Sequence, residues 1–500
     1  MDLAGFRRAA HDAVDRVCDY YATLASRPVS AQVERGYLLA ALPDAAPETG
    51  EPWDAIMRDY DAHVLPGLTH WQHPMFFGFF PANSSFEGII AEMLTSGTPT
   101  SGSNWAASPA VTELEFVVVD WLARMLGLGP AFCTRDAATP GGGVILGGAS
   151  EATLTMAVAA RARALAHLGS SGASVDTSRL VLYCTTQTHS SAAKAAMLLG
   201  LACRTLDVRR EDNYALRGTT LRAAIAEDTA RGMHPFFVAT SYGTTNSCAV
   251  DDLAEVAAAA EMHPHLWLHV DAAYGGVTLA LPEERDARLL AAINARFDSF
   301  STNLHKWGLV PIECSPTYVR DRQALRAALE LTPEYLRSRG GEMNELMDLR
   351  NLQIPLGRRT RGLKMWMVLR SYGVQGFQAH LRSGYVCSVS TDASIALARR
   401  FADAISARTL PHASFELVNP PRWGLVMFRL VCSAHADTDA LNRRFHERVL
   451  AHADAILLTP TVLPGVGYCE RLVVGAPSTR AEHIDRAVDV LCTCALETIG

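Results

Sequence analysis

Hydrophobic and polar positions alternate between about residues 87 and 370 in a way that predicts helices and strands in turn. Apolar residues at helical spacing predict helices at 117–128, at 150–168 with Ser150 as the cap, and from His189 onward. Short continuous apolar runs predict strands within 141–148, 179–185, 236–245 and 266–276. Strands that alternate with helices indicate an α/β fold, in which a mostly parallel sheet has helices on both faces.

The two ends of the chain follow other patterns. Apolar residues recur at helical spacing between Phe6 and Leu24, which predicts an amphipathic helix, and a loop rich in proline follows at 41–52. Beyond about residue 380, a helix at 391–408 is predicted together with short strands at 424–432 and 469–476. We therefore expect three regions: a helical N-terminal segment (1–85), a large α/β domain (86–378) and a small α+β domain (379–500).

Composition narrows the class of protein. The 500 residues are 49% hydrophobic and 19% charged, which is ordinary for a globular chain. The formal net charge of −7 argues against a nucleic-acid or anionic membrane partner. No apolar run approaches the ~18 residues of a membrane span, and arginines and aspartates interrupt the N-terminal apolar positions, so no signal peptide is predicted. The 11 cysteines include no CxxC pair, which predicts reduced thiols in a cytoplasmic protein and no metal site.

Lysine is rare in this chain, and one lysine stands in an apolar setting. Only Lys194, Lys306 and Lys364 occur among 45 basic residues, and Lys306 lies between FDSF and WGLV. A surface position is the ordinary interpretation of a lysine. Arginine, however, cannot lose its proton at working pH, whereas a desolvated lysine becomes a neutral nucleophile that can form a Schiff base. We therefore favour Schiff-base chemistry at Lys306.

Three further features could serve the same chemistry. Asp271 ends an apolar strand, either as a local cap or as the partner of a protonated pyridine nitrogen. The glycine-rich run 141–150 precedes a helix and could cradle a phosphate, although glycine turns are common. His189 is either structural or a flat ring against a cofactor. Because Thr245, Asp271 and Lys306 all follow strand-like runs, we expect them at one edge of the sheet.

Taken together, these motifs resemble the group II pyridoxal-phosphate-dependent decarboxylases that act on aromatic L-amino acids. The resemblance extends from the first helix to about residue 385 and continues more weakly to the end. It rests on the motifs ERGYL, PGLTHWQHPMFFGFFPANSS, NWAASPAVTELE, ASEATL, HSS, HVDAAYGG, NLHKW and QIPLGRR followed by LKMW. It implies the fold of the aspartate-aminotransferase-like enzymes, with a seven-stranded sheet, and pyridoxal 5′-phosphate as cofactor.

The resemblance also implies roles for individual residues. Lys306 would bind the cofactor covalently, Asp271 would pair with its pyridinium, and His189 would stack on its ring. The remaining cofactor contacts would come from Ala149, Ser150, Thr245, Ala273, Asn303 and His305. Gly148 departs from the family pattern, because many relatives carry serine there and its hydroxyl contact to the phosphate would be absent.

A catalytic loop is implied as well. Tyr335, in LTPEYLRSRGG, falls on the tyrosine that would return a proton to the substrate with help from His189. In the family this loop closes over the site of the other subunit, which implies a homodimer with active sites at the interface. Oxidative aldehyde synthases of the family often replace this tyrosine or the stacked histidine. Since both are present here, plain decarboxylation is favoured.

The resemblance places eight residues around the substrate: Trp71, Phe79, Phe80, Pro81, Ala82, Ser101, Ser103 and Gly357. Phe79 and Ala82 lack the hydroxyls with which relatives contact phenolic rings, and a ring hydroxyl without partners binds poorly. Ser101 and Ser103 stand where some relatives carry bulkier apolar residues, so they would leave more room for the substrate ring. The alternative is that the surrounding side chains repack and fill this space. The hypothesis is therefore that L-tryptophan is preferred and converted to tryptamine, ahead of phenylalanine, tyrosine and DOPA. An aldehyde synthase, an aminotransferase and a non-catalytic ligand-binding relative remain alternatives.

Overall fold

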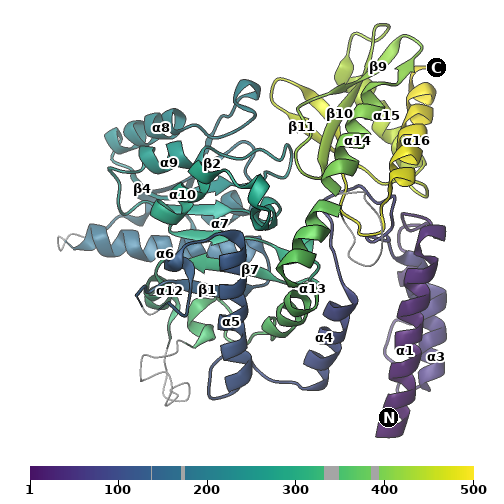
Figure 1. The fold of residues 1–500 in the computed structure, drawn as a ribbon, viewed down its shortest axis with the longest axis horizontal. Coiled ribbons are helices and arrows are strands. Elements are labelled where there is room, and N and C mark those ends of the chain that lie inside the picture. Colours follow the sequence, from purple (N-terminus) through teal and green to yellow (C-terminus); the bar gives the residue numbers. More distant parts are fainter. Residues whose placement is uncertain (137, 171–174, 332–347, 384–393) are drawn as a thin grey trace.

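A seven-stranded sheet forms the centre of the larger part of the molecule (Figure 1). The computed structural model describes residues 1–136, 138–170, 175–331, 348–383 and 394–500. The strands are β1 (Gly142–Leu146), β2 (Leu180–Thr185), β3 (Ala202–Leu206), β4 (His234–Ser241), β5 (Trp267–Asp271), β6 (Ser299–Ser301) and β7 (Ser315–Val319). Their order is β1-β7-β6-β5-β4-β2-β3. Only β7 runs antiparallel to its neighbours among these strands, so the expected mostly parallel sheet is confirmed.

Helices cover both faces of this sheet, which explains the continuous apolar runs of its strands. Alternate residues of β2 belong to two separate apolar cores: Leu180 and Leu182 to one, Val181 and Tyr183 to the other. The helices of this part are α4 (Phe86–Gly97), α5 (Pro109–Leu126), α6 (Ala149–Gly169), α7 (Ser191–Leu199), α8 (Gly218–Ala230), α9 (Leu253–Ala259), α10 (Ala287–Arg296), α11 (Leu304–Trp307), α12 (Arg322–Leu329) and α13 (Gly362–Ser383). The expectation that Ser150 caps α6 is wrong, because the helix begins at Ala149 and Gly148 is its cap.

A smaller antiparallel sheet lies beside the larger one, near the C-terminus (Figure 1). Its strands are β8 (Thr409–Leu410), β9 (Ala413–Leu417), β10 (Leu425–Cys432), β11 (Thr459–Leu463) and β12 (Gly467–Val473), in the order β11-β12-β10-β9-β8. Helices α14 (Ser394–Ser406), α15 (Thr438–Ala451) and α16 (Ala481–Ile499) share one apolar core with it. This arrangement confirms the α+β pattern expected near the C-terminus.

The N-terminal segment divides into a projecting part and a part that joins the smaller sheet. Helices α1 (Leu3–Thr23) and α3 (Trp53–Asp59) lie side by side, away from both sheets (Figure 1), and α2 (Tyr37–Ala41) lies between them in the sequence. Further along, Phe77 is buried in the smaller core; its amide donates to the carbonyl of Leu457 at 3.0 Å, and its carbonyl accepts from the amide of Val473 at 2.9 Å. The chain therefore passes through the smaller domain before it enters the larger one.

Within the described ranges, no helix has both the length and the apolar character needed to cross a membrane.

A buried ion pair holds the start of the larger sheet, and its loss should destabilise the fold. Arg358 Nη2 lies 2.7 Å from Glu115 Oε1, and the two side chains are 1% and 0% exposed. Replacing Glu115 with Gln should lower the free energy of unfolding by ~3–5 kcal/mol, because the guanidinium would stay buried without its counter-charge. Denaturant unfolding measures this. The control is Arg408→Gln, which breaks the exposed pair with Asp489 and should cost less than ~1 kcal/mol. Equal losses in both variants would contradict the argument.

Candidate active site

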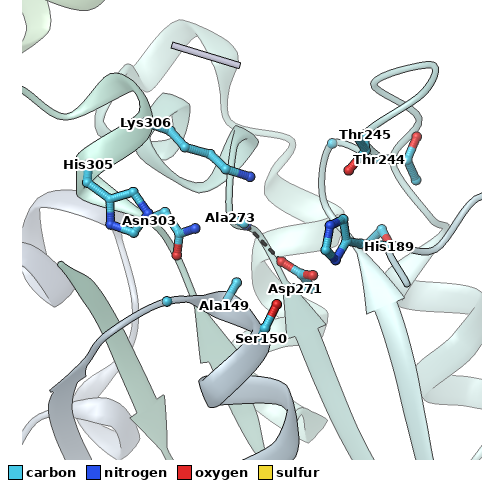
Figure 2. A pocket seen from close by; sticks show the side chains of 13 residues that line it. Ala149, Ser150, His189, Thr244, Thr245, Asp271, Ala273, Asn303, His305 and Lys306 are labelled. Carbon is cyan, nitrogen blue, oxygen red and sulfur yellow. Dashed lines mark hydrogen bonds between the residues drawn. The ribbon is translucent and has the colours of Figure 1, made fainter. Parts of the chain in front are cut away.

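The candidate site is a cavity of ≈ 250 Å³ at the carboxyl ends of the central strands (Figure 2). It is lined by Gly148, Ala149, Ser150, His189, Ser241, Gly243, Thr244, Thr245, Asp271, Ala273, Asn303, His305 and Lys306. Parallel strands end at the same edge of a sheet, so residues far apart in the sequence meet there. Every cofactor-binding residue expected from the sequence lines this cavity.

Lys306 extends into the cavity from the short helix α11, which follows β6 (Figure 2). Its carbonyl oxygen accepts a hydrogen bond from the amide of Asn83 at 3.2 Å, which ties this turn to the segment that enters the larger domain. Burial lowers the pKa of the Lys306 amine, the carboxylate of Asp271 opposes that shift, and the guanidinium of Arg471 adds to it. The setting therefore favours the neutral, nucleophilic amine.

Asp271 ends β5, between the ends of the strands that carry Ser241 and Ser301. One carboxylate oxygen, Oδ1, accepts the amide hydrogen of Ala273 at 3.0 Å, and this bond fixes the orientation of the group (Figure 2). The carboxylate points into the cavity below Lys306. It is thus available to pair with a protonated ring nitrogen.

His189 presents its Nε2 atom as a donor. The amide of Ser191 donates to Nδ1 of His189 at 3.2 Å. Because an amide can only donate, the neutral imidazole of His189 carries its proton on Nε2. Nδ1 of His305 lies 2.9 Å from the amide nitrogen of Cys314 and 3.0 Å from its carbonyl oxygen, so these contacts are compatible with either neutral tautomer of His305. Burial lowers the pKa of His189, and it lowers the pKa of His305 to about 4. Both rings are therefore neutral near pH 7.

A second part of the cavity can hold an anion. Helix α6 begins at Ala149, so the amides of its first turn and the positive end of the helix dipole face this region. A Cβ built at Gly148 would meet nothing within 4 Å, so there is free space beside these amides. Asn303 lines the same cavity, and the NH₂ group of its side-chain amide can donate hydrogen bonds to an anion. These groups suit a phosphate.

The residues present fit pyridoxal phosphate. Lys306 offers an amine to its aldehyde carbon and Asp271 a carboxylate to its ring nitrogen. The start of α6, with Asn303 and His305 opposite, offers donors to its phosphate (Figure 2). His189 stands beside Asp271, where a flat ring could lie against it.

None of the eight expected substrate residues lines the cavity, and they separate into three groups. Phe80, Pro81 and Ala82 belong to the segment that reaches Lys306 through Asn83, and the Lys306 Nζ lies 5.1 Å from the centre of the Phe80 ring. Trp71 and Phe79 stack on each other at the surface, with ring centres 5.3 Å apart. Ser101, Ser103 and Gly357 do not line the cavity of this chain. Tyr335 lies outside the described residues.

Sequence reasoning missed four residues at or near the site. Ser241, Gly243 and Thr244 line the cavity with Thr245, and their common run SYGTT was the available signal. Arg471 lies in β12 of the smaller sheet, where a charged residue within the apolar run CERLVVGA was the signal.

Comparison with known proteins identifies the family. Residues 36–431 match the family described as "Pyridoxal-dependent decarboxylase conserved domain". Tryptophan decarboxylase 2 of Oryza sativa subsp. japonica is 39% identical over 505 residues, which cover 100% of this chain and 96% of that protein. Phenylacetaldehyde synthase of Arabidopsis thaliana is 38% identical over 496 residues, which cover 98% of this chain and 96% of that protein. The crystal structure of Oryza sativa TDC with PLP and tryptamine has a TM-score of 0.91 at 36% identity and covers 100% of this chain and 99% of its own. The chain belongs to the pyridoxal-dependent decarboxylase family, and its cofactor is pyridoxal 5′-phosphate.

Proposed function

We propose that the protein decarboxylates an aromatic L-amino acid to the corresponding arylalkylamine and carbon dioxide, with L-tryptophan as the preferred substrate. The observation that carries the proposal is the meeting of Lys306, Asp271 and His189 around one cavity. Relatives named for tryptophan, tyrosine and aromatic-L-amino-acid decarboxylation support the substrate class.

The chemistry divides between the cofactor and the chain. Pyridoxal phosphate, when bound, withdraws the electron pair of the bond that joins the substrate α-carbon to its carboxylate. Asp271 would keep the proton on the ring nitrogen, which would make that withdrawal favourable. The amine of Lys306 would hold the cofactor and would be displaced by the substrate amine. His189 would lie against the ring and, together with Tyr335, would return a proton to the α-carbon.

The substrate side chain would lie against Phe80. Neither Phe79 nor Ala82 offers a hydroxyl to a phenolic ring. A buried ring hydroxyl without a partner loses its hydrogen bonds to water, so phenols and catechols bind less well than indole or phenyl rings. This supports the order tryptophan, phenylalanine, then tyrosine and DOPA.

We also propose that two copies of the chain form a homodimer through residues 1–85. Helix α1 buries none of its side chains, and Leu3, Phe6 and Val14 are exposed on it. Ser101, Ser103, Gly357 and Tyr335 would complete the site of the other copy. Sedimentation equilibrium tests this, because a particle of one 54.1 kDa chain would contradict it.

Phenylacetaldehyde synthase, at 38% identity, makes oxidative chemistry the second candidate. The presence of both His189 and Tyr335 favours decarboxylation. Release of peroxide and ammonia together with carbon dioxide would identify the synthase. An aminotransferase would instead require a keto-acid acceptor, and a non-catalytic relative would release no carbon dioxide.

Replacing Lys306 with Ala should abolish covalent cofactor binding, because no other amine lines the cavity within the described chain. The wild-type protein should show a visible absorbance band that disappears on borohydride treatment. The Lys306→Ala variant should never form this band. The matched control is Lys194→Ala, which removes an exposed lysine and should leave the band unchanged. A colourless wild-type protein after incubation with pyridoxal phosphate would refute the Schiff base.

Initial rates on four amino acids test the substrate order. Tryptophan should have the highest kcat/KM, followed by phenylalanine, then tyrosine and DOPA. The double variant Phe79→Tyr with Ala82→Ser should raise kcat/KM for tyrosine relative to phenylalanine by about 10-fold, because it supplies partners for the ring hydroxyl. A wild-type preference for DOPA or tyrosine would overturn this part of the proposal.

Replacing Gly148 with Ser should tighten cofactor binding. The site has free space for the new side chain and an extended backbone, with φ −162°, that serine adopts without strain. One added hydrogen bond to the phosphate should lower the dissociation constant of pyridoxal phosphate by about 2- to 10-fold. The control Gly147→Ser should weaken binding, since its Cβ would lie 2.8 Å from Glu151 Oε2. Unchanged binding in Gly148→Ser would show that the hydroxyl does not reach the phosphate.

A further inference from the structure

A tryptophan of the smaller domain occupies a tight turn beside the larger domain. Trp423 lies between β9 and β10, where Arg422 and Leu425 exchange two backbone hydrogen bonds of 3.1 and 3.0 Å. It is 5% exposed, and its backbone has φ +52°, a value that a bulky residue rarely adopts. A strained residue of this kind persists where its surroundings hold it in place. The packing of the indole ring therefore stabilises this turn.

The indole covers the point at which the chain segments after β4 and β5 come closest. Tyr242 directly follows β4, and its amide donates to the carbonyl of Asp271, the last residue of β5, at 2.8 Å. A Cβ built at Gly275 would clash with the carbonyl oxygen of Tyr242 and with the indole of Trp423. A Cβ built at Gly243 would lie 2.9 Å from the indole Cζ3. Glycine is therefore required at both positions, and the indole lies directly against both backbones.

These two segments also line the cofactor cavity. Gly243 and Thr245 are lining residues from the segment after β4, and Asp271 and Ala273 are lining residues from the end of β5. Gly275 comes two residues after Ala273, whose amide donates to Oδ1 of Asp271 at 3.0 Å. A shift of either backbone would therefore move the Asp271 carboxylate relative to Thr245.

Two side-chain hydrogen bonds add to the contact of the ring. Nε1 of Trp423 donates to Oε2 of Glu284 at 3.2 Å, and Glu284 belongs to the segment that follows β5. In the same connection between β9 and β10, Nδ2 of Asn419 donates to the carbonyl of Ser247 at 3.1 Å. Ser247 belongs to the loop that follows β4. The smaller domain thus holds both segments, each through a hydrogen bond and through the indole.

We propose that Trp423 is a positioning residue for the cofactor site. Its indole holds the segments after β4 and β5 together, so that the carboxylate of Asp271 meets the ring nitrogen of the bound cofactor. Trp423 is not among the residues that line the cavity, so it acts through the two backbones. Displacing a reacting group by ~1 Å can lower a rate by ~100-fold. The inference rests on the role proposed for Asp271, and it does not depend on which amino acid reacts.

Cofactor binding by variants of Trp423 tests the proposal. In Trp423→Ala the dissociation constant of pyridoxal phosphate should rise by about 10-fold, and kcat at saturating cofactor should fall by about 10- to 100-fold, because Asp271 is no longer held in place. The visible circular dichroism per bound cofactor should fall as well, since it reports how rigidly the ring is held. Trp423→Leu should be intermediate. Trp423→Phe should restore most of the affinity, because a ring still lies against Gly243.

Hydrogen exchange of the holoenzyme separates positioning from a general loss of stability. In Trp423→Ala the amides of residues 242–250 and 272–276 should exchange about 10-fold faster, because the ring that covers these segments is gone. Strand β2 and helix α15 are not in these segments, and their amides should keep the rates of the wild type.

Two control variants accompany these measurements. Trp121→Ala removes a tryptophan of α5 that is 38% exposed, and it should change neither cofactor affinity nor the circular dichroism. Asn419→Ala removes the hydrogen bond to Ser247 and keeps the indole. It should raise the dissociation constant of pyridoxal phosphate by about 2- to 10-fold, the effect of losing one hydrogen bond.

Three results would overturn the proposal. One is cofactor affinity and circular dichroism that stay at wild-type values in Trp423→Ala or, if that variant does not fold, in Trp423→Leu. Another is an equal loss in Trp423→Phe and Trp423→Ala, which would assign the effect to the bond with Glu284. The third is faster exchange throughout both domains, which would indicate a general structural role. If the wild type decarboxylates no aromatic amino acid, the proposed function fails, while cofactor affinity and hydrogen exchange still decide the role of Trp423.

Discussion

The separation of a buried amine from a carboxylate is the constraint on which the rest of the site depends. Lys306 and Asp271 face one cavity, and no ion pair joins them in the described structure. Direct contact would keep the amine protonated and occupy the carboxylate. Because the two groups come from the ends of neighbouring strands, the rigid sheet holds them apart and leaves room for a flat cofactor between them. Burial lowers the pKa of the amine, and the distant carboxylate limits that shift.

The phosphate end of the cavity relies on backbone dipoles more than on charged side chains. The first turn of α6 supplies amides, and His305 supplies a neutral ring that is held at Nδ1 by the backbone of Cys314. Among the residues that line the cavity, Lys306 is the only one with an amine or guanidinium. The charged side chains that line the cavity are therefore the amine of Lys306 and the carboxylate of Asp271.

A segment that is hydrogen-bonded to the smaller domain lies beside Lys306. The segment from Phe77 to Asn83 hydrogen-bonds to β12 at one end and to the carbonyl of Lys306 at the other. Phe80 stacks on Tyr274, which stacks on Trp307 with ring centres 5.4 Å apart. This column of rings joins the segment before α4 to the larger domain beside the amine of Lys306.

Much of the fold and the cofactor site could be predicted from the sequence. Apolar runs such as RLVLYCT predicted strands buried on both faces, and the rarity of lysine directed attention to Lys306. Asp271 and Thr245 were expected at the same edge because parallel strands end together. Local patterns succeed here because a strand that is buried on both faces is marked by its own apolar run, and helices between successive strands allow those strands to run parallel. The cap of α6 was placed wrongly at Ser150, because the backbone turn at Gly148 leaves no signal in side-chain polarity.

The sequence by itself determined the residue types that the chemistry requires: a lysine where arginine could not lose a proton, an aspartate at a strand end, and small residues before a helix. Only the tertiary structure decided which neighbours act on them. The proton position of His189 depends on the amide that its ring meets, and Arg471 comes beside Phe80 through the pairing of β12 with a segment almost 400 residues earlier. Such contacts depend on how distant elements pack, because electric fields and hydrogen bonds act through space and not along the chain.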